Sequence, residues 1–157
     1  MARIRLEIPE ELPFATEVIL RVGDMNYGNH LGNDALLGLL HEARLQFLAS
    51  LGYSEMDLGG HASIMADVAI VYKAQAFRGD CLRIAVGTGD FTGSGFDVLY
   101  RVSNVATGAL VALAKTGQVL FDYERGRPLR LDDALRLRLS GAAAPVPASA
   151  MRENERC

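Results

Sequence analysis

The longest regular pattern in this chain is helical. Between residues 35 and 51, apolar side chains recur on most sides of a helix, and polar ones are confined to a narrow row. A helix that is apolar on so many sides is surrounded by other structure. Asn33 or Asp34 is suited to cap its first turn, and Gly52 follows its last turn. Gly38 costs the helix about 1 kcal/mol relative to Ala, which indicates that another backbone approaches it closely.

Segments that alternate apolar and polar residues lie on both sides of this helix. Short turns rich in Gly, Asp, Asn and Thr separate the later segments, and such short connections favour antiparallel neighbours. A sheet of this kind buries one face by curling around the single helix, so the expected fold class is α+β. The alternation predicts about five strands, over residues 15–22, 63–73, 82–88, 96–102 and 109–123.

The chain of 157 residues fits one domain with a substantial core. We expect residues 1–137 to form that domain, with a last helical turn at residues 129–135. Residues 138–157 are rich in Ala and Pro and then in charge, a composition typical of a disordered tail. The amino-terminal residues lack the apolar core of a signal peptide, and no apolar run is long enough to span a bilayer.

The charge balance and the cysteine count argue against several kinds of partner. The net charge is −3, so no basic field draws the chain to nucleic acid or to an anionic membrane. Two cysteines, Cys81 and Cys157, are too few for a disulfide framework, which favours a reducing compartment. Three scattered histidines give no metal-ligand spacing, and no cofactor is expected. The sequence therefore predicts a soluble cytoplasmic protein.

Residues 22–34 form a polar, glycine-containing loop between the first strand and the helix. The first turn of a helix leaves backbone N–H groups unpaired and carries partial positive charge. An oxygen atom that gains negative charge during a reaction is stabilised at such a place. If the protein does chemistry, we expect it at this loop.

The loop carries several candidate residues. Asp24 and Asn26 share one face if the strand continues through them, so Asp24 would act as base for a water molecule that Asn26 orients. Alternatively, Asp24 accepts hydrogen bonds from nearby loop N–H groups. His30 can polarise a carbonyl group, act as a base or assist a leaving thiolate, or it ties the loop together. Tyr27 is a wall of the site or a surface aromatic, and Asn33 caps the helix while lining the site.

The spacing of these residues carries a family resemblance. The motif Asp24-x-Asn26-x-x-x-His30-x-x-Asn33, followed by a Leu-His-Glu-Ala-Arg run at 40–44, resembles the hot-dog thioesterases. The similar branch contains the 4-hydroxybenzoyl-CoA thioesterase-like and long-chain acyl-CoA thioesterase-like proteins.

This resemblance covers residues 15–135 in the order of elements, with the segment 72–80 also similar. It implies a curved sheet wrapped around the central helix, pairing into dimers, and acyl-CoA sites at the subunit interface. It also implies that the thioester carbonyl meets the N–H groups of Asn33, Asp34 or their neighbours. Independently, the exposed edges of such a sheet favour self-association, to a dimer or a tetramer.

Asn26 stands where the similar enzymes usually have an aspartate that attacks the thioester or activates water. An amide has no basic lone pair at neutral pH and can do neither. A carboxylate elsewhere would then drive hydrolysis, with Asp24 as the first candidate and Glu42 as the second. In another hot-dog branch, a carboxylate on the helix reaches into the site of the facing subunit, and Glu42 could have the same role. Alternatively, Glu42 forms an ion pair with Arg44 at the helix surface.

Three functions follow from these observations. The preferred one is hydrolysis of an acyl-CoA thioester to CoA and a carboxylic acid. A second is acyl-CoA binding without catalysis, which the amide of Asn26 suggests. A third is hydration of an enoyl-CoA, because the hydratase motif Gly-Asp-x-Asn-Pro-x-His partly overlaps residues 23–27. Lys73, Arg78 and Lys115 could meet CoA phosphates, although solvated surface charges are the simpler interpretation.

Overall fold

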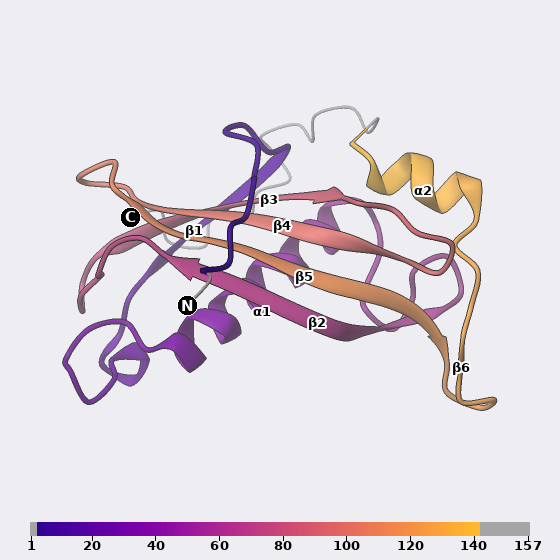
Figure 1. Ribbon diagram of the computed structural model, residues 1–157, viewed down its shortest axis with the longest axis horizontal. Helices are drawn as coiled ribbons and strands as arrows, with labels where there is room; N and C mark the ends of the chain where they lie inside the picture. The colour runs from indigo at the N-terminus through magenta and orange to yellow at the C-terminus, as the bar shows by residue number, and fades with distance from the viewer. Residues whose placement is uncertain (1–2, 142–157) are drawn as a thin grey trace.

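The computed structural model describes residues 3–141, which form one sheet with a long helix on one side (Figure 1). Among these residues, no helix is long and apolar enough to cross a membrane. The elements in chain order are β1 (Phe14–Ile19), the 3₁₀ turn η1 (Val22–Asp24), α1 (Asn33–Ser50), β2 (Ala62–Tyr72), β3 (Cys81–Gly89), β4 (Gly95–Asn104), β5 (Leu110–Asp122), β6 (Arg127–Pro128) and α2 (Asp133–Leu139).

All strands pair antiparallel, in the order β1-β3-β4-β5-β2, and the short β6 pairs with β5. Figure 1 shows the sheet in front and α1 behind it, with α2 beyond one end of the sheet. β1 and β2 are therefore the two ends of the main strand order. The predicted α+β class is confirmed, with five long strands and one short additional strand.

The core lies between α1 and one face of the sheet. On β3 and β4, every second side chain faces the helix and is removed from water, as the alternation predicted. Burying one such aliphatic side chain stabilises the fold by about 1.5–3 kcal/mol. The core residues with at most 2% exposure include Leu36, Leu40, Ala43 and Phe47 of α1, Leu82, Ile84 and Val86 of β3, and Val98, Tyr100 and Val102 of β4.

A charged side chain also enters this core. Arg44 of α1 is only 5% exposed, and its Nε donates to Oε1 of Glu55 at 2.8 Å. His41 and Glu55 are joined by a second contact, Nε2 to Oε2, at 2.9 Å. Burial alone would raise the pKa of Glu55, but the hydrogen bonds from His41 and Arg44 outweigh it and hold that pKa below its usual value. Arg44 thus pairs with Glu55, not with Glu42.

The predicted cap at the amino-terminal end of α1 was wrong, whereas the predicted glycine after its carboxyl-terminal end is present. The helix begins at Asn33, and Gly32 is its N-cap without any side-chain hydrogen bond, so capping by Asn33 or Asp34 was wrong. The loop itself decides this start, because the N–H of Gly32 is held by the carbonyl oxygen of Asp24 at 2.9 Å. At the other end Gly52 has a φ of +82°, the left-handed conformation that favours glycine after a helix.

Two further predictions about this region were wrong. The first strand ends at Ile19 and not at residue 22, because residues Val22–Asp24 turn into η1. The extended backbone that would have put Asp24 and Asn26 on one face is therefore absent there. Apart from its chain neighbours and the adjacent backbone of its own helix, no described residue lies within 4 Å of a Cβ built on Gly38, so the expected close approach does not occur within the described residues.

The short helix α2 covers one end of the core. Arg138 donates through Nε and Nη2 to the carbonyl oxygen of Leu51, at 3.0 and 2.7 Å, and so satisfies the carboxyl end of α1. Leu139 is 1% exposed, so the packed chain continues past residue 137. Residues 142–157, most of the predicted tail, lie outside the described residues.

Candidate active site

The loop between β1 and α1 is organised by the amide of Asn26. Its Oδ1 accepts hydrogen bonds from the N–H of Gly28 at 2.9 Å and of His30 at 3.3 Å. The backbone N–H of Asn26 donates to the carbonyl oxygen of His30 at 2.8 Å. Asn29, between them, has a φ of +61°, a conformation that Asn tolerates better than most residues. The loop is therefore a closed turn built on one side chain.

A second loop lies against the first. The N–H of Leu31 donates to the carbonyl oxygen of Ala76 at 2.8 Å, which joins the start of α1 to the segment that follows β2. Ala76 is 1% exposed at this contact. Residues far apart in the sequence are thereby brought to one place.

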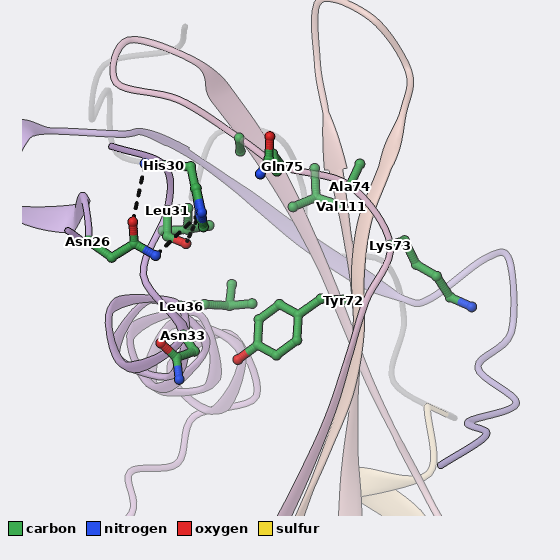
Figure 2. A pocket seen from close by; sticks show the side chains of 11 residues that line it. Asn26, His30, Leu31, Asn33, Leu36, Tyr72, Lys73, Ala74, Gln75 and Val111 are labelled. Atoms are coloured by element: carbon green, nitrogen blue, oxygen red, sulfur yellow. Dashed lines mark hydrogen bonds between the residues drawn. The ribbon is translucent and has the colours of Figure 1, made fainter. Parts of the chain in front are cut away.

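A cavity of about 440 Å³ opens between these loops and the amino-terminal end of α1 (Figure 2). Its polar lining is made of amides, one imidazole, one phenol and one amine, and none of the described residues that line it is Asp or Glu. The lining consists of Asn26, His30, Leu31, Asn33, Leu36, Tyr72, Lys73, Ala74, Gln75, Ala76 and Val111.

The first turn of α1 presents unpaired N–H groups beside this cavity. The helical hydrogen bonds start with Leu36, whose N–H donates to the carbonyl oxygen of Gly32 at 2.9 Å. The N–H groups of Asn33, Asp34 and Ala35 precede that bond, and none of them donates to any residue in the range 3–141. Since Asn33 and Leu36 line the cavity, the partial positive charge of the helix terminus faces it.

His30 lines the cavity, and both of its side-chain contacts involve the ring atom Nδ1. Its Nδ1 is 3.3 Å from Nδ2 of Asn26 and 3.3 Å from the carbonyl oxygen of Leu31. With hydrogen on Nδ1, the ring donates to Leu31 and leaves a lone pair on Nε2. With hydrogen on Nε2, Nδ1 accepts from Asn26 instead. In the first tautomer Nε2 of His30 is a base, and in the second it is a donor.

Tyr72 is a wall residue that the sequence did not single out. It is the last residue of β2, and its ring extends from the sheet toward the start of α1, near Asn33 and Leu36 (Figure 2). Burial, and secondarily the carboxylate of Asp34, raise the pKa of the Tyr72 phenol. The phenol therefore keeps its proton well above neutral pH. The only sequence feature that pointed to Tyr72 was the resemblance of residues 72–80 to the hot-dog thioesterases.

The other predicted candidates lie away from the cavity lining. Oδ2 of Asp24 accepts from the N–H of Arg21 at 2.7 Å, which is the loop interaction considered as its alternative. Glu42 is exposed on α1 and accepts from Nε2 of Gln46 at 2.8 Å. Tyr27 is fully exposed. The structure thus brings Asn26, His30 and Asn33 together, while Asp24, Tyr27, Asp34 and Glu42 do not line the cavity.

Of the cations considered for CoA phosphates, Lys73 is the one at the cavity. It lies at the rim, and its amine points away from the interior (Figure 2). Lys115 is held by Asp97 at 2.8 Å and by Asp67 at 3.5 Å, on the face of the sheet opposite α1. Among residues 3–141, no three His, Cys, Asp or Glu side chains gather as ligands for a metal ion.

Solved structures with this fold share its architecture at low sequence identity. A 1,4-dihydroxy-2-naphthoyl-CoA thioesterase from Synechocystis is 21% identical with a TM-score of 0.72, over 80% of this chain and 94% of that one. A DHNA-CoA thioesterase from Staphylococcus aureus is 21% identical with a TM-score of 0.68, over 75% and 80%. The probable thioesterase YbaW from Escherichia coli is 21% identical with a TM-score of 0.66, over 84% and 98%. The hot-dog fold is thereby confirmed.

The sequence itself gives the family. Among curated proteins, none matches this chain. The family model of the thioesterase-like superfamily matches residues 20–150, which is most of the sequence and includes the whole cavity lining. The protein belongs to the thioesterase-like superfamily.

Proposed function

We propose that the protein hydrolyses acyl-CoA thioesters at this cavity. The observation that carries the proposal is the set of unpaired N–H groups in the first turn of α1, beside a cavity that His30 also lines. Such N–H groups stabilise the negative charge that develops on a carbonyl oxygen during acyl transfer. Membership of the thioesterase-like superfamily supports the same reaction class.

In this mechanism the thioester carbonyl oxygen accepts from the N–H groups of residues 33–35. His30, with hydrogen on Nδ1 donated to Leu31, takes a proton from a water molecule through Nε2. The water oxygen attacks the carbonyl carbon, the carbon–sulfur bond breaks, and the imidazolium returns its proton to the CoA thiolate. His30 takes the role first given to Asp24, because neither Asp24 nor Glu42 lines the cavity of its own chain. Glu42 of a facing copy is the alternative base, and the variants below distinguish the two.

The same proposal includes a second copy of the chain. α1 packs mainly against β1 and β3, so the face of β2 on the helix side stays open to water. Met65, Val68 and Tyr72 on that face are 43%, 41% and 52% exposed. β2 also ends the main strand order, and exposed strand edges are usually paired or covered. A second copy that covers this face would close the cavity from the open side.

The test is thiol release by the full chain from a panel of acetyl-, octanoyl-, palmitoyl-, benzoyl- and crotonyl-CoA. We expect turnover with at least one substrate, and His30→Gln to lower it by about 10²–10⁴-fold. His61→Gln is the matched control, since His61 is exposed and outside the cavity lining. If Asp24→Asn or Glu42→Gln removes activity while His30→Gln does not, the assignment of the base is wrong.

Binding of acyl-CoA without turnover is the second candidate. The observation that favours it is a cavity lining with no carboxylate among the described residues, together with an amide at Asn26. It predicts saturable binding of the CoA esters and no thiol release from any of them. Loss of crotonyl-CoA absorbance without thiol release would instead indicate a hydratase.

A further inference from the structure

The hydroxyl of Tyr72 is a hydrogen-bond donor with no partner among residues 3–141, and it reaches the site from the sheet. Tyr72 lies opposite Ala112 in the register of β2 and β5, which places its side chain on the helix side of the sheet. Figure 2 shows the ring crossing from β2 toward α1, with the hydroxyl directed to the region of Asn33.

Donors therefore approach one region of the cavity from two elements. From α1 come the unpaired N–H groups of its first turn, and from β2 comes the phenolic O–H. A carbonyl oxygen has two lone pairs, so one can accept from the helix while the other accepts from a donor on the opposite side. The electrostatic influence of Asp34 on Tyr72 is consistent with the hydroxyl lying close to that helical turn.

We propose that the Tyr72 hydroxyl donates a hydrogen bond to the carbonyl oxygen of the bound thioester, opposite the N–H groups of α1. This inference rests on the proposed acyl-CoA site. The phenol is uncharged, so it stabilises the developing oxyanion without acting as a base itself. A donor that strengthens its bond in the transition state acts mainly on kcat.

The deciding experiment compares two non-hydrolysable analogues of octanoyl-CoA. In the ketone analogue a methylene replaces the sulfur and the carbonyl remains, whereas the thioether analogue lacks the carbonyl. Dissociation constants are measured for the full-length wild type, for Tyr72→Phe and for Tyr123→Phe. The control residue Tyr123 is 61% exposed and packs edge-on against Phe121, away from the cavity lining.

We expect Tyr72→Phe to weaken binding of the ketone analogue by about tenfold, the loss of one net hydrogen bond, and to leave binding of the thioether unchanged. With a hydrolysable substrate, its kcat should fall by about 10²–10³-fold, and KM should rise by no more than the roughly tenfold loss of affinity expected with the ketone analogue. Tyr123→Phe should match the wild type in every measurement.

Equal affinity of Tyr72→Phe and wild type for the ketone would overturn the inference. An equal loss with both analogues would also overturn it, since the hydroxyl would then act on something other than the carbonyl. If the wild type releases no thiol, the proposed hydrolysis fails, yet the difference between the two analogues still decides the Tyr72 contact. If the wild type binds neither analogue, both proposals fail.

Discussion

The N–H of Leu31 and the carbonyl oxygen of Ala76 are 2.8 Å apart, and their hydrogen bond joins the two loops that form the candidate site. One loop precedes α1 and carries Asn26 and His30; the other follows β2. Both partners are backbone groups, so the bond depends on chain path and not on side-chain identity. The cavity between these loops is therefore part of the fold, and its side chains can be varied one at a time.

Asn26 is predicted to act through the loop that it holds together. Asn26→Ala removes the acceptor of the N–H groups of Gly28 and His30, and we expect it to lower the free energy of unfolding by about 1–2 kcal/mol. Asn26→Asp keeps an oxygen for both donors and should match the wild type within about 0.5 kcal/mol. Urea denaturation monitored by circular dichroism measures both; an equal loss in the two variants would contradict this role.

Gly28 is predicted to leave room for the imidazole of His30. A Cβ at position 28 would lie 3.0 Å from Nε2 of His30, so Gly28→Ala must displace that ring or the loop. We expect a fall in kcat/KM of about tenfold or more, because misplaced catalytic groups lose rate steeply. The control is Gly23→Ala, where a Cβ meets nothing within 4 Å. Unchanged kinetics in Gly28→Ala would show that the ring position is unimportant.

A substitution at Gly38 tests whether a second copy of the chain packs against α1 in solution. Apart from its chain neighbours and the adjacent helix backbone, no described residue lies within 4 Å of a Cβ at this position, so Gly38→Ala should stabilise an uncovered helix by about 0.5–1 kcal/mol. Gly52→Ala provides the contrast, because its φ of +82° strains any other residue and stability should fall. Destabilisation by Gly38→Ala, measured together with oligomeric state, would instead indicate that a second copy approaches α1 there.

Glu55 is predicted to make stability depend on acid pH. Its pKa is lowered in the folded state, so its contribution is complete above the unfolded value of 4.5 and is lost as pH falls through the folded value. Glu55→Gln should remove that part of the pH dependence. At pH 7 it should also cost about 2–3 kcal/mol, because it leaves Arg44 buried without its anion; Glu55 is partly exposed, which lowers the cost.

Glu42→Gln is the control for this measurement, since Glu42 is exposed on the same helix. Its effect on unfolding should stay within about 0.5 kcal/mol at every pH. If Glu55→Gln shows the same pH profile as the wild type, the ion pair with Arg44 does not contribute to acid sensitivity.

The local elements could be predicted because their signals are local. The helical period of α1 and the alternation in β3 and β4 follow from side-chain periodicity, and the structure confirms both. The described residues cover only part of α1, however, since Leu45 is 36% exposed, so the expectation that other structure surrounds this helix was wrong within one chain. The end of β1 and the cap of α1 were not predicted correctly, because the loop between them determines both. The hydrogen bond from Gly32 to Asp24 sets the start of α1, and no short-range preference of Asn33 or Asp34 competes with it.

The candidate site shows the same division between local and long-range information. The motif placed Asn26 and His30 in one loop and Asn33 at the start of the helix that follows, because covalent spacing alone keeps them together. Tyr72 and Ala76 join them only through strand pairing and the bond between Leu31 and Ala76. Likewise, only the folded chain shows that Asp24 bonds to Arg21 and that Glu42 faces water. The sequence by itself determined the elements and the loop; which side chains reach the cavity was decided by contacts between distant segments.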